Sequence, residues 1–280
     1  SQIEIFIFFI SIVAACIIYF SRIGFTNDIS IILKSLSLVF IVIFLPAIII
    51  KDKELFFLKP IISFIIILLL ILYGFIKIIY QFDISFFFYF LGFLLFVYFS
   101  IFIFFTKKIT YKKIFFLLIC SFFAIFIVSA YYGNHYTHPL MMEKIINGSW
   151  AHRDILYHSS ISGMFKTYLN GGTGVDGFVP FYYHKLSHFI IATFSEILNT
   201  NTLIFYSIVY PILITPIFFL FFIYSAIEAS KYFSFKERFK KTSEKDNITW
   251  FIVFIFFALP FNRYYLSEHY QYIQSQSYAI

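Results

Sequence analysis

The residues that could do chemistry gather in one stretch of the chain, Trp150–Phe189. Six of the seven histidines lie between His135 and His188, in a chain that otherwise has few polar residues. The stretch also contains a carboxylate, Asp154, together with several cations and a glycine-rich turn. A carboxylate near cations and imidazoles can be kept ionised, and it can then accept a proton or bind a cation. We therefore expect any active site to lie in this stretch.

Segment Ala151–Leu169 has the periodicity of an amphipathic helix. Polar residues recur at every fourth position, which puts them on one slowly drifting stripe; they are Asp154, His158, Ser162 and Lys166. The other stripe is apolar and consists of Tyr157, Ile161, Met164, Phe165 and Tyr168. Asp154 would lie one turn from His158 and beside Arg153, which makes Asp154 the candidate catalytic base and His158 its catalytic partner. The alternative interpretation is a structural surface helix that rests on the membrane.

A second group of polar residues follows the glycine-rich turn. His184 and His188 lie one helical turn apart, next to Lys185 and just after Tyr183. Two imidazoles at this spacing could chelate a divalent metal ion, but the sequence offers no HExxH glutamate and no clear third ligand. The same side chains donate hydrogen bonds and could equally hold a phosphate. Both interpretations stay open, and no cofactor is assigned beyond a possible divalent metal ion.

The composition is that of a membrane protein. Hydrophobic residues make up 61% of the chain and charged residues 12%, with a mean hydropathy of +0.89; soluble domains have about 25% charged residues. The net charge of +7 comes mostly from short loops between apolar runs, where the positive-inside rule explains it, so we assign no nucleic-acid partner. The predicted fold class is all-α: a polytopic transmembrane helical bundle with an amphipathic juxtamembrane helical outer loop.

Apolar runs long enough to span a bilayer precede the chemical stretch. They are Ile3–Phe20, Ile29–Ile50, Ile61–Tyr80, Ile84–Phe105 and Ile114–Tyr132. The loops that begin at Lys51 and Lys107 are basic and should be cytoplasmic. Asp28, Asp83 and the polar stretch after Tyr132 should then face the outer side.

The C-terminal part constrains the topology further. Leu203–Ala229 is a long apolar run in which Pro211 and Pro216 would be tolerated as kinks, and it leads to a basic loop at residues 230–247 that should be cytoplasmic. An odd number of crossings must separate that loop from the outer stretch. We therefore expect His184–Leu198 to lie along the membrane surface or to re-enter the membrane.

Three regions follow from these patterns. Residues 1–132 should form about five N-terminal transmembrane helices. Residues 133–202 should form an outer loop with amphipathic or re-entrant helices and the candidate active site. Residues 203–280 should form C-terminal transmembrane helices with a basic cytoplasmic loop. We also expect the chain to be a piece of a longer protein.

The motif Asp154-x-x-Tyr157-His158, followed by a glycine-rich gap and the segment Tyr182–His188, resembles the first large outer loop of membrane glycosyltransferases with the GT-C fold. The resemblance covers about a quarter of the chain, Trp150–Phe222. It implies transfer of a sugar from a polyprenyl-phosphate-linked donor to a glycan or protein acceptor, at the outer face of a bacterial inner or plasma membrane. The partners would be the bilayer, the lipid-linked donor and the acceptor.

The resemblance also implies roles for residues. In that family an acidic residue of the outer loop usually deprotonates the acceptor hydroxyl or binds a divalent metal, and by position this would be Asp154. Binding of the substrate and its phosphate would fall to Arg153, Lys166, Tyr183, His184, Lys185 and His188. The usual plan places the acidic loop directly after the first span, which here would select Asp28 instead.

Two other function classes remain. A multi-pass transporter or permease could line a pathway with Lys34, Lys77 and the histidines, but the polar groups gather in an outer loop and not at the middle of the membrane. A noncatalytic membrane protein is the third interpretation.

Overall fold

The computed structural model describes residues 29–50, 57–106, 153–172 and 185–210, and isolated positions elsewhere up to residue 224. All regular elements within these ranges are helical, which agrees with the predicted all-α class. They are α2 (Ile29–Ile49), α3 (Leu58–Tyr80), α4 (Ser85–Thr106), α7 (Arg153–Tyr168), α8 (Lys185–Ile197), α9 (Thr202–Ile204) and the π-helix η3 (Phe205–Val209). The predicted spans Ile3–Phe20 and Ile114–Tyr132, and everything after residue 224, lie outside the described residues apart from single positions.

The predicted apolar runs correspond closely to α2, α3 and α4. By length and composition, α2 and α3 could each cross a membrane, and the described part of α4 is also apolar. Helix α3 ends at Tyr80 because Gln81 adopts the left-handed conformation, with φ of 54°, and donates its N–H to the Lys77 carbonyl at 2.9 Å. The turn to α4 is therefore only four residues long.

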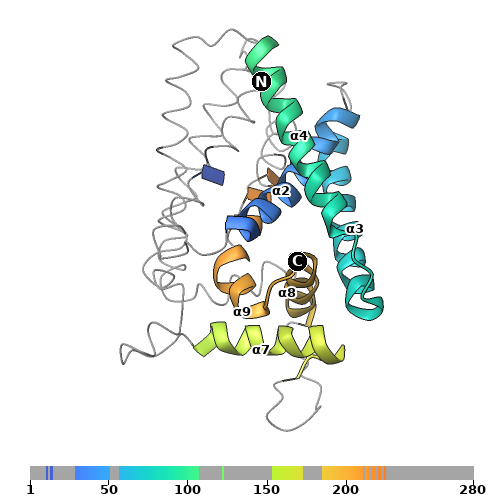
Figure 1. The fold of residues 1–280 in the computed structure, drawn as a ribbon, viewed down its shortest axis with the longest axis vertical. Coiled ribbons are helices and arrows are strands. Elements are labelled where there is room, and N and C mark those ends of the chain that lie inside the picture. The colour runs from blue at the N-terminus through green and yellow to red at the C-terminus, as the bar shows by residue number, and fades with distance from the viewer. Residues whose placement is uncertain are drawn as a thin grey trace, which may run out of the picture.

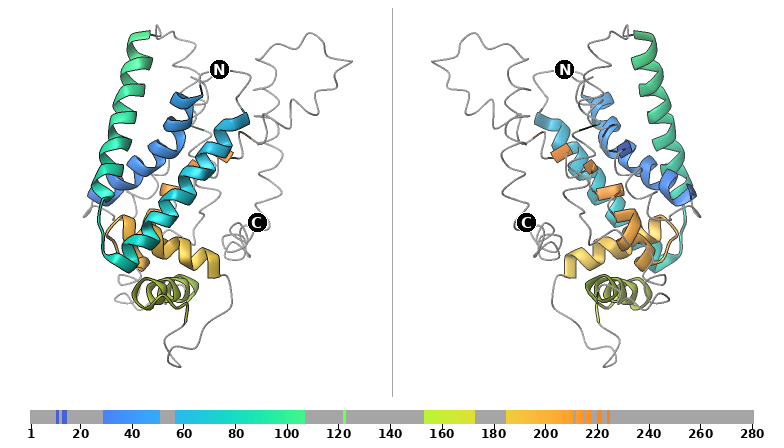
Figure 2. Two further views of the ribbon diagram at one scale, coloured as in Figure 1. Left: turned by 90° about the vertical axis from the view of Figure 1, so that its right-hand side faces the viewer. Right: turned by 90° about the vertical axis from the view of Figure 1, so that its left-hand side faces the viewer.

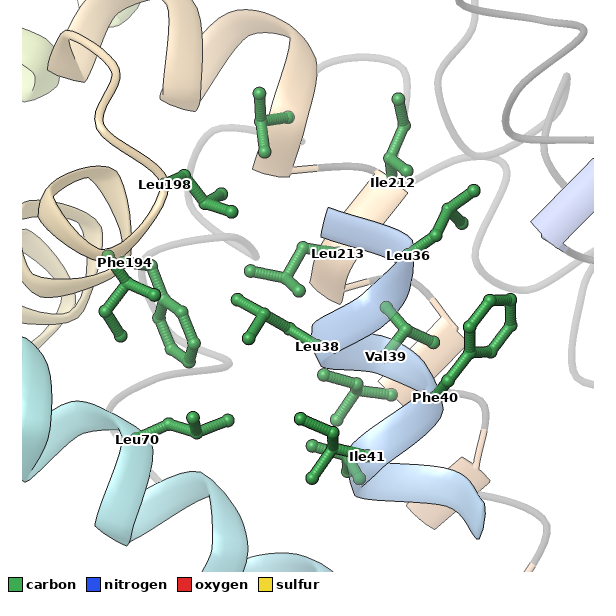
Figure 3. Close-up of a cluster of buried hydrophobic side chains, with 14 of the residues drawn as sticks. Leu36, Leu38, Val39, Phe40, Ile41, Leu70, Phe194, Leu198, Ile212 and Leu213 are labelled. Carbon is green, nitrogen blue, oxygen red and sulfur yellow. The ribbon is translucent and has the colours of Figure 1, made fainter. Parts of the chain in front are cut away.

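Helix α2 forms the centre of the described structure. Apart from Lys34 and three serines in its first half it is apolar on all sides, as expected for a helix that other helices surround. Figure 3 shows its side chains meeting residues of α3, of the α8 segment and of the chain after η3. The labelled members of this cluster are Leu36, Leu38, Val39, Phe40, Ile41, Leu70, Phe194, Leu198, Ile212 and Leu213. The candidate site is thus attached to the apolar core through α8.

Helix α7 lies crosswise at one end of the described helices. In Figure 1 it runs across the lower end of the molecule, whereas α3 and α4 are steep; in Figure 2 it is seen end-on below α8. Helix α8 packs on both α3 and α7, so it connects the apolar helices to the crosswise one. This arrangement places α7 where polar and apolar parts of the molecule meet.

The run after Asn201 differs from the single kinked helix predicted for Leu203–Ala229. The Asn201 side chain accepts the Ile204 N–H at 2.7 Å and so caps α9. The backbone then widens into η3, in which the Tyr210 N–H donates to the Phe205 carbonyl. Pro211 follows directly in the sequence and has no N–H to continue an α-helical ladder. The first turns of this run are therefore irregular, and one of their side chains, Tyr206, reaches the candidate site.

Glycines permit close approach between the apolar helices. A Cβ at Gly92 of α4 would overlap the Ser37 carbonyl oxygen of α2, and a Cβ at Gly74 of α3 would lie 2.7 Å from the Thr193 carbonyl oxygen of α8. Close backbone packing of this kind stabilises helix pairs in lipid, where the hydrophobic effect between helices is absent. Ser63 adds a hydrogen bond from α3 to the Val42 carbonyl of α2, at 2.9 Å.

We predict that Gly92→Ala lowers the free energy of unfolding by about 1–3 kcal/mol, because the added methyl group must push α4 away from the α2 backbone. Thermal unfolding in detergent micelles would measure this. Gly163→Ala in α7 is the matched control, since its Cβ would meet only the Thr202 hydroxyl at 3.3 Å. Equal melting temperatures for the two variants would contradict the close packing of α2 on α4.

Candidate functional site

The site is built where α7 and α8 cross. Ser162 in α7 and Ala192 in α8 are both fully buried. On each helix, a polar residue lies four positions before this buried residue and another lies four positions after it. The two positions before are His158 and His188; the two after are Lys166 and Glu196. Both pairs are in contact, so the crossing is held on either side by a polar pair. Ser162 and Ala192 are small, and small side chains allow helices to approach closely.

The first pair joins two buried imidazoles. His158 Nδ1 lies 2.7 Å from His188 Nε2, with the ring centroids 5.0 Å apart. The exposed fraction is 8% for His158 and zero for His188. Such a short distance requires one nitrogen to donate and the other to accept, so the protonation states of the two rings depend on each other. The Tyr206 ring of η3 lies 5.7 Å from the His158 ring and completes one wall of the site.

The second pair fixes the other end of the crossing. Lys166 Nζ lies 3.0 Å from Glu196 Oε2 and donates to the Thr200 carbonyl at 2.8 Å. Nearby, the Thr202 hydroxyl donates to the Ser159 carbonyl at 2.8 Å. Helix α7 is thus attached to both α8 and the start of α9.

A polar network lies where α8 ends against the turn between α3 and α4. Lys77 is buried, with 4% of its side chain exposed, and its Nζ lies 3.0 Å from Asp83 Oδ2. It also donates to Asn199 Oδ1 at 2.6 Å and to the Ser85 hydroxyl at 3.1 Å. Asn199 follows α8 in the left-handed conformation that asparagine tolerates, with φ of 52°. The network offsets the free-energy cost of burying the Lys77 ammonium group. It also anchors the C-terminal end of α8.

Several donors converge on Asp83. Its Oδ1 accepts the Ser85 backbone N–H at 2.8 Å at the start of α4, a position where a helix dipole favours negative charge. Partial burial by itself raises the pKa of Asp83. The hydrogen bonds from Ser85, Lys77 and Asn199 outweigh burial, and the pKa of Asp83 lies well below its ordinary value. Asp83 therefore stays ionised at neutral pH.

The predicted site residues divide into three groups. His158 and His188 come together, although they are 30 residues apart in the chain. Lys166 lies in the same crossing, and Lys185 is exposed at the start of α8. For Arg153 and Asp154 the structure describes the helical backbone alone, and Tyr183 and His184 lie outside the described residues. The roles expected of Asp154 and His184 therefore stay predictions.

The orientation of α7 differs from a simple amphipathic helix. His158 and Ser162 of the polar stripe are buried, whereas Tyr168 of the apolar stripe is exposed. The burial is possible because the polar groups find partners: the Ser162 hydroxyl donates to the His158 carbonyl at 2.8 Å, and His158 meets His188. Within this stripe, His158 and Lys166 contact residues of α8.

Glu196, Asn199 and Tyr206 belong to the site but were not identified from the sequence. Each looks like an isolated polar or aromatic residue in an apolar context, and its partners lie far away in the chain. The equal spacing of Lys166 from His158 and of Glu196 from His188 is the one signal that could have been used. Among the described residues, no three His, Cys, Asp or Glu side chains gather in a way that could hold a metal ion.

We predict that Asp83→Asn lowers the free energy of unfolding at pH 7 by about 1–2 kcal/mol, a modest value because 45% of the Asp83 side chain is exposed. Since the folded-state pKa is depressed, the carboxylate stabilises the fold fully above its ordinary pKa of 3.8, and this contribution is lost as the pH falls below that value. Chemical denaturation at neutral and acidic pH would show the difference between wild type and variant shrinking in acid. If the stability difference between wild type and Asp83→Asn does not depend on pH, the charge of Asp83 does not have this role. The double variant Lys77→Met/Asp83→Asn, compared with the two single variants, completes a double-mutant cycle.

Comparison with known proteins yields no relative: no family model, curated protein or solved structure matches the chain. Any function assigned to it therefore depends on its own residues and their geometry.

Proposed function

We propose that this chain is a multi-pass membrane glycosyltransferase of the GT-C type, which moves a sugar from a polyprenyl-phosphate-linked donor to an acceptor at the outer face of a bacterial inner or plasma membrane. The observation that carries the proposal is the buried His158–His188 pair. Its first member, His158, lies on the crosswise helix α7 at the end of the apolar helices (Figure 1), one turn along that helix from the candidate base Asp154.

The apolar surface of α3 supports the membrane location. Large hydrophobic side chains are exposed along one face at spacings of three and four residues, which a soluble protein would bury. They include Ile61, Phe64, Ile65, Leu68, Leu69, Leu72, Ile76 and Ile79. Helix α4 exposes a similar row that begins at Phe86 and continues to Ile101. Exposed apolar faces of this kind are favourable in contact with lipid and unfavourable in contact with water.

The contacts of Asp83 support the outer position of the site. Loop charges place the turn at Asp83 and the polar stretch after Tyr132 on the same, outer side. In the structure Asn199, at the end of α8, donates to Asp83 at 3.4 Å, and Lys77 bonds to both. Two segments assigned to one side by charge alone are thus in contact.

The proposed reaction needs a base at the boundary between lipid and water. The acceptor hydroxyl loses its proton to Asp154, its oxygen bonds to the anomeric carbon, and the bond from that carbon to the phosphate oxygen breaks, which leaves the polyprenyl phosphate. In this proposal His158, one turn away on α7, stabilises or shares that proton. Arg153, Tyr183, His184 and Lys185 are the proposed donors to the phosphate.

Lys166 and Lys77 are omitted from the proposed substrate contacts. Lys166 is held by Glu196 and by the Thr200 carbonyl, and Lys77 is held by Asp83 and Asn199. Lysines with two or more fixed partners are better explained as structural. The same contacts give no specific support to a transporter pathway through Lys77.

We predict that Asp154→Asn lowers sugar transfer by about 100-fold or more, the usual contribution of a general base, while the protein still folds and inserts. The assay would reconstitute the protein in vesicles with a panel of radiolabelled polyprenyl-phosphate hexoses and a cell-envelope glycan acceptor. Thr167→Ala, at an exposed position of the same helix, is the control. Full activity of Asp154→Asn would remove Asp154 from the mechanism, and wild-type protein that transfers no sugar from any donor would count against the function itself.

A further inference from the structure

Lys34 of α2 differs from the lysines that are held by fixed partners. Lys77 and Lys166 each bond to oxygen atoms of two or more other residues. Lys34 is partly buried, and among the described residues its ammonium contacts only the Tyr89 ring of α4, whose centroid lies 5.8 Å from Nζ. Such a cation–π contact stabilises the ammonium but supplies no acceptor for its N–H donors. No carboxylate of the described residues pairs with Lys34.

The contact between Lys34 and Tyr89 lies at the same end of the apolar helices as the polar network. Lys34 is the sixth residue of α2 and lies about 8 Å along the axis from its first residue. Tyr89 lies one turn after Ser85, which bonds to Lys77, and the Tyr89 hydroxyl donates to the Ile197 carbonyl at the end of α8. The loop charges predict that this end faces the outer side. The ammonium therefore lies near the outer boundary of the apolar layer.

The side chains next to this contact are apolar and exposed. Leu33, which precedes Lys34, is 58% exposed. Phe86 and Phe93, one turn before and one turn after Tyr89, are 71% and 57% exposed. A cation among exposed apolar side chains matches an amphiphile, in which an anionic group adjoins hydrocarbon chains. A small soluble anion would match the charge alone.

We propose that Lys34 and the Tyr89 ring form a binding site for one anionic glycerophospholipid of the outer leaflet. The Lys34 ammonium donates to the lipid phosphate, and the Tyr89 ring holds the ammonium in place. The acyl chains lie along the exposed phenylalanines of α4. The inference rests on the membrane location in the proposed function and does not depend on sugar transfer.

Native mass spectrometry of the protein in a nonionic detergent tests the site without any sugar donor. The protein would be titrated with phosphatidylglycerol or with phosphatidylcholine that has the same acyl chains. We expect wild type to bind the first phosphatidylglycerol about 3- to 10-fold more tightly, since one lysine near an anionic lipid contributes a factor of about five. Equal affinities for the two lipids would overturn the proposal.

Two pairs of variants locate the lipid. Lys34→Gln should remove most of the preference for phosphatidylglycerol, whereas Lys34→Arg keeps the charge and should retain it. Tyr89→Phe keeps the ring and should bind the lipid as wild type does, whereas Tyr89→Leu should bind it about 2- to 5-fold more weakly. Thermal unfolding in lipid-free detergent checks that each variant is folded.

Either pair can reject the site. If folded Lys34→Gln keeps the full preference, the lipid binds elsewhere and the proposal is wrong. If Lys34→Gln does not fold, the Tyr89 pair decides the question, because equal lipid binding by Tyr89→Phe and Tyr89→Leu would also overturn the proposal.

Two further probes identify the source of the phosphate. Inorganic phosphate at millimolar concentration should not displace phosphatidylglycerol, because it has no acyl chains; displacement would assign the site to a soluble anion and overturn the proposal. Undecaprenyl phosphate should compete no better than phosphatidylglycerol. A stronger competition that depends on Lys34 would assign the site to the sugar donor and overturn the assignment to a glycerophospholipid.

Flotation with lipid vesicles separates the failure of this inference from that of the proposed function. Wild-type protein that does not float with vesicles would reject the membrane location and both proposals with it. Protein that floats but shows no preference between the two lipids would reject the lipid site alone. A preference that depends on Lys34, in protein that transfers no sugar from any donor, would support the lipid site and reject the glycosyltransferase.

Discussion

The contact between His158 and His188 requires two helices from distant parts of the chain to cross at one defined register. The histidines, Ser162 with Ala192, and Lys166 with Glu196 follow the same four-residue spacing on both helices. A shift of either helix by one residue would separate both polar pairs, and each buried imidazole left without its hydrogen bond would cost about 1–3 kcal/mol. The polar pairs thus give specificity to a crossing that apolar packing alone would define less sharply.

A chain so rich in apolar residues must provide partners for the polar groups that it buries. Lys77 illustrates this, since its ammonium is satisfied by Asp83 in the turn between α3 and α4, by Ser85 at the start of α4 and by Asn199 just after α8. Moving a charge from water into the protein interior costs free energy unless each of its donors is hydrogen-bonded to an acceptor. Once the network forms, it also holds the end of the helix that carries His188. The polar network around Lys77 and the proposed site are therefore connected through α8.

The arrangement of the described helices relates structure to the proposed chemistry. Large apolar side chains of α3 and α4 are exposed, whereas the ion pairs and the histidine pair involve α7, α8 and the turn between α3 and α4. A donor with a lipid tail and an acceptor from water can meet only where such surfaces adjoin.

The sequence by itself determined the helical class, the approximate bounds of α2, α3, α4, α7 and α8, and the stretch in which polar chemistry is concentrated. These features are local, because an apolar run or a polar residue at every fourth position predicts a helix whatever the tertiary structure around it. The irregular turn at η3 was missed because a proline indicates a break but not how the preceding backbone adjusts to it. Only the tertiary structure decided that His158 and Ser162 of the polar stripe of α7 are buried, that Lys166 meets Glu196, and that His188 meets His158. Such pairings depend on how helices cross and on which groups the crossing can satisfy, and neither is encoded in the periodicity of one segment.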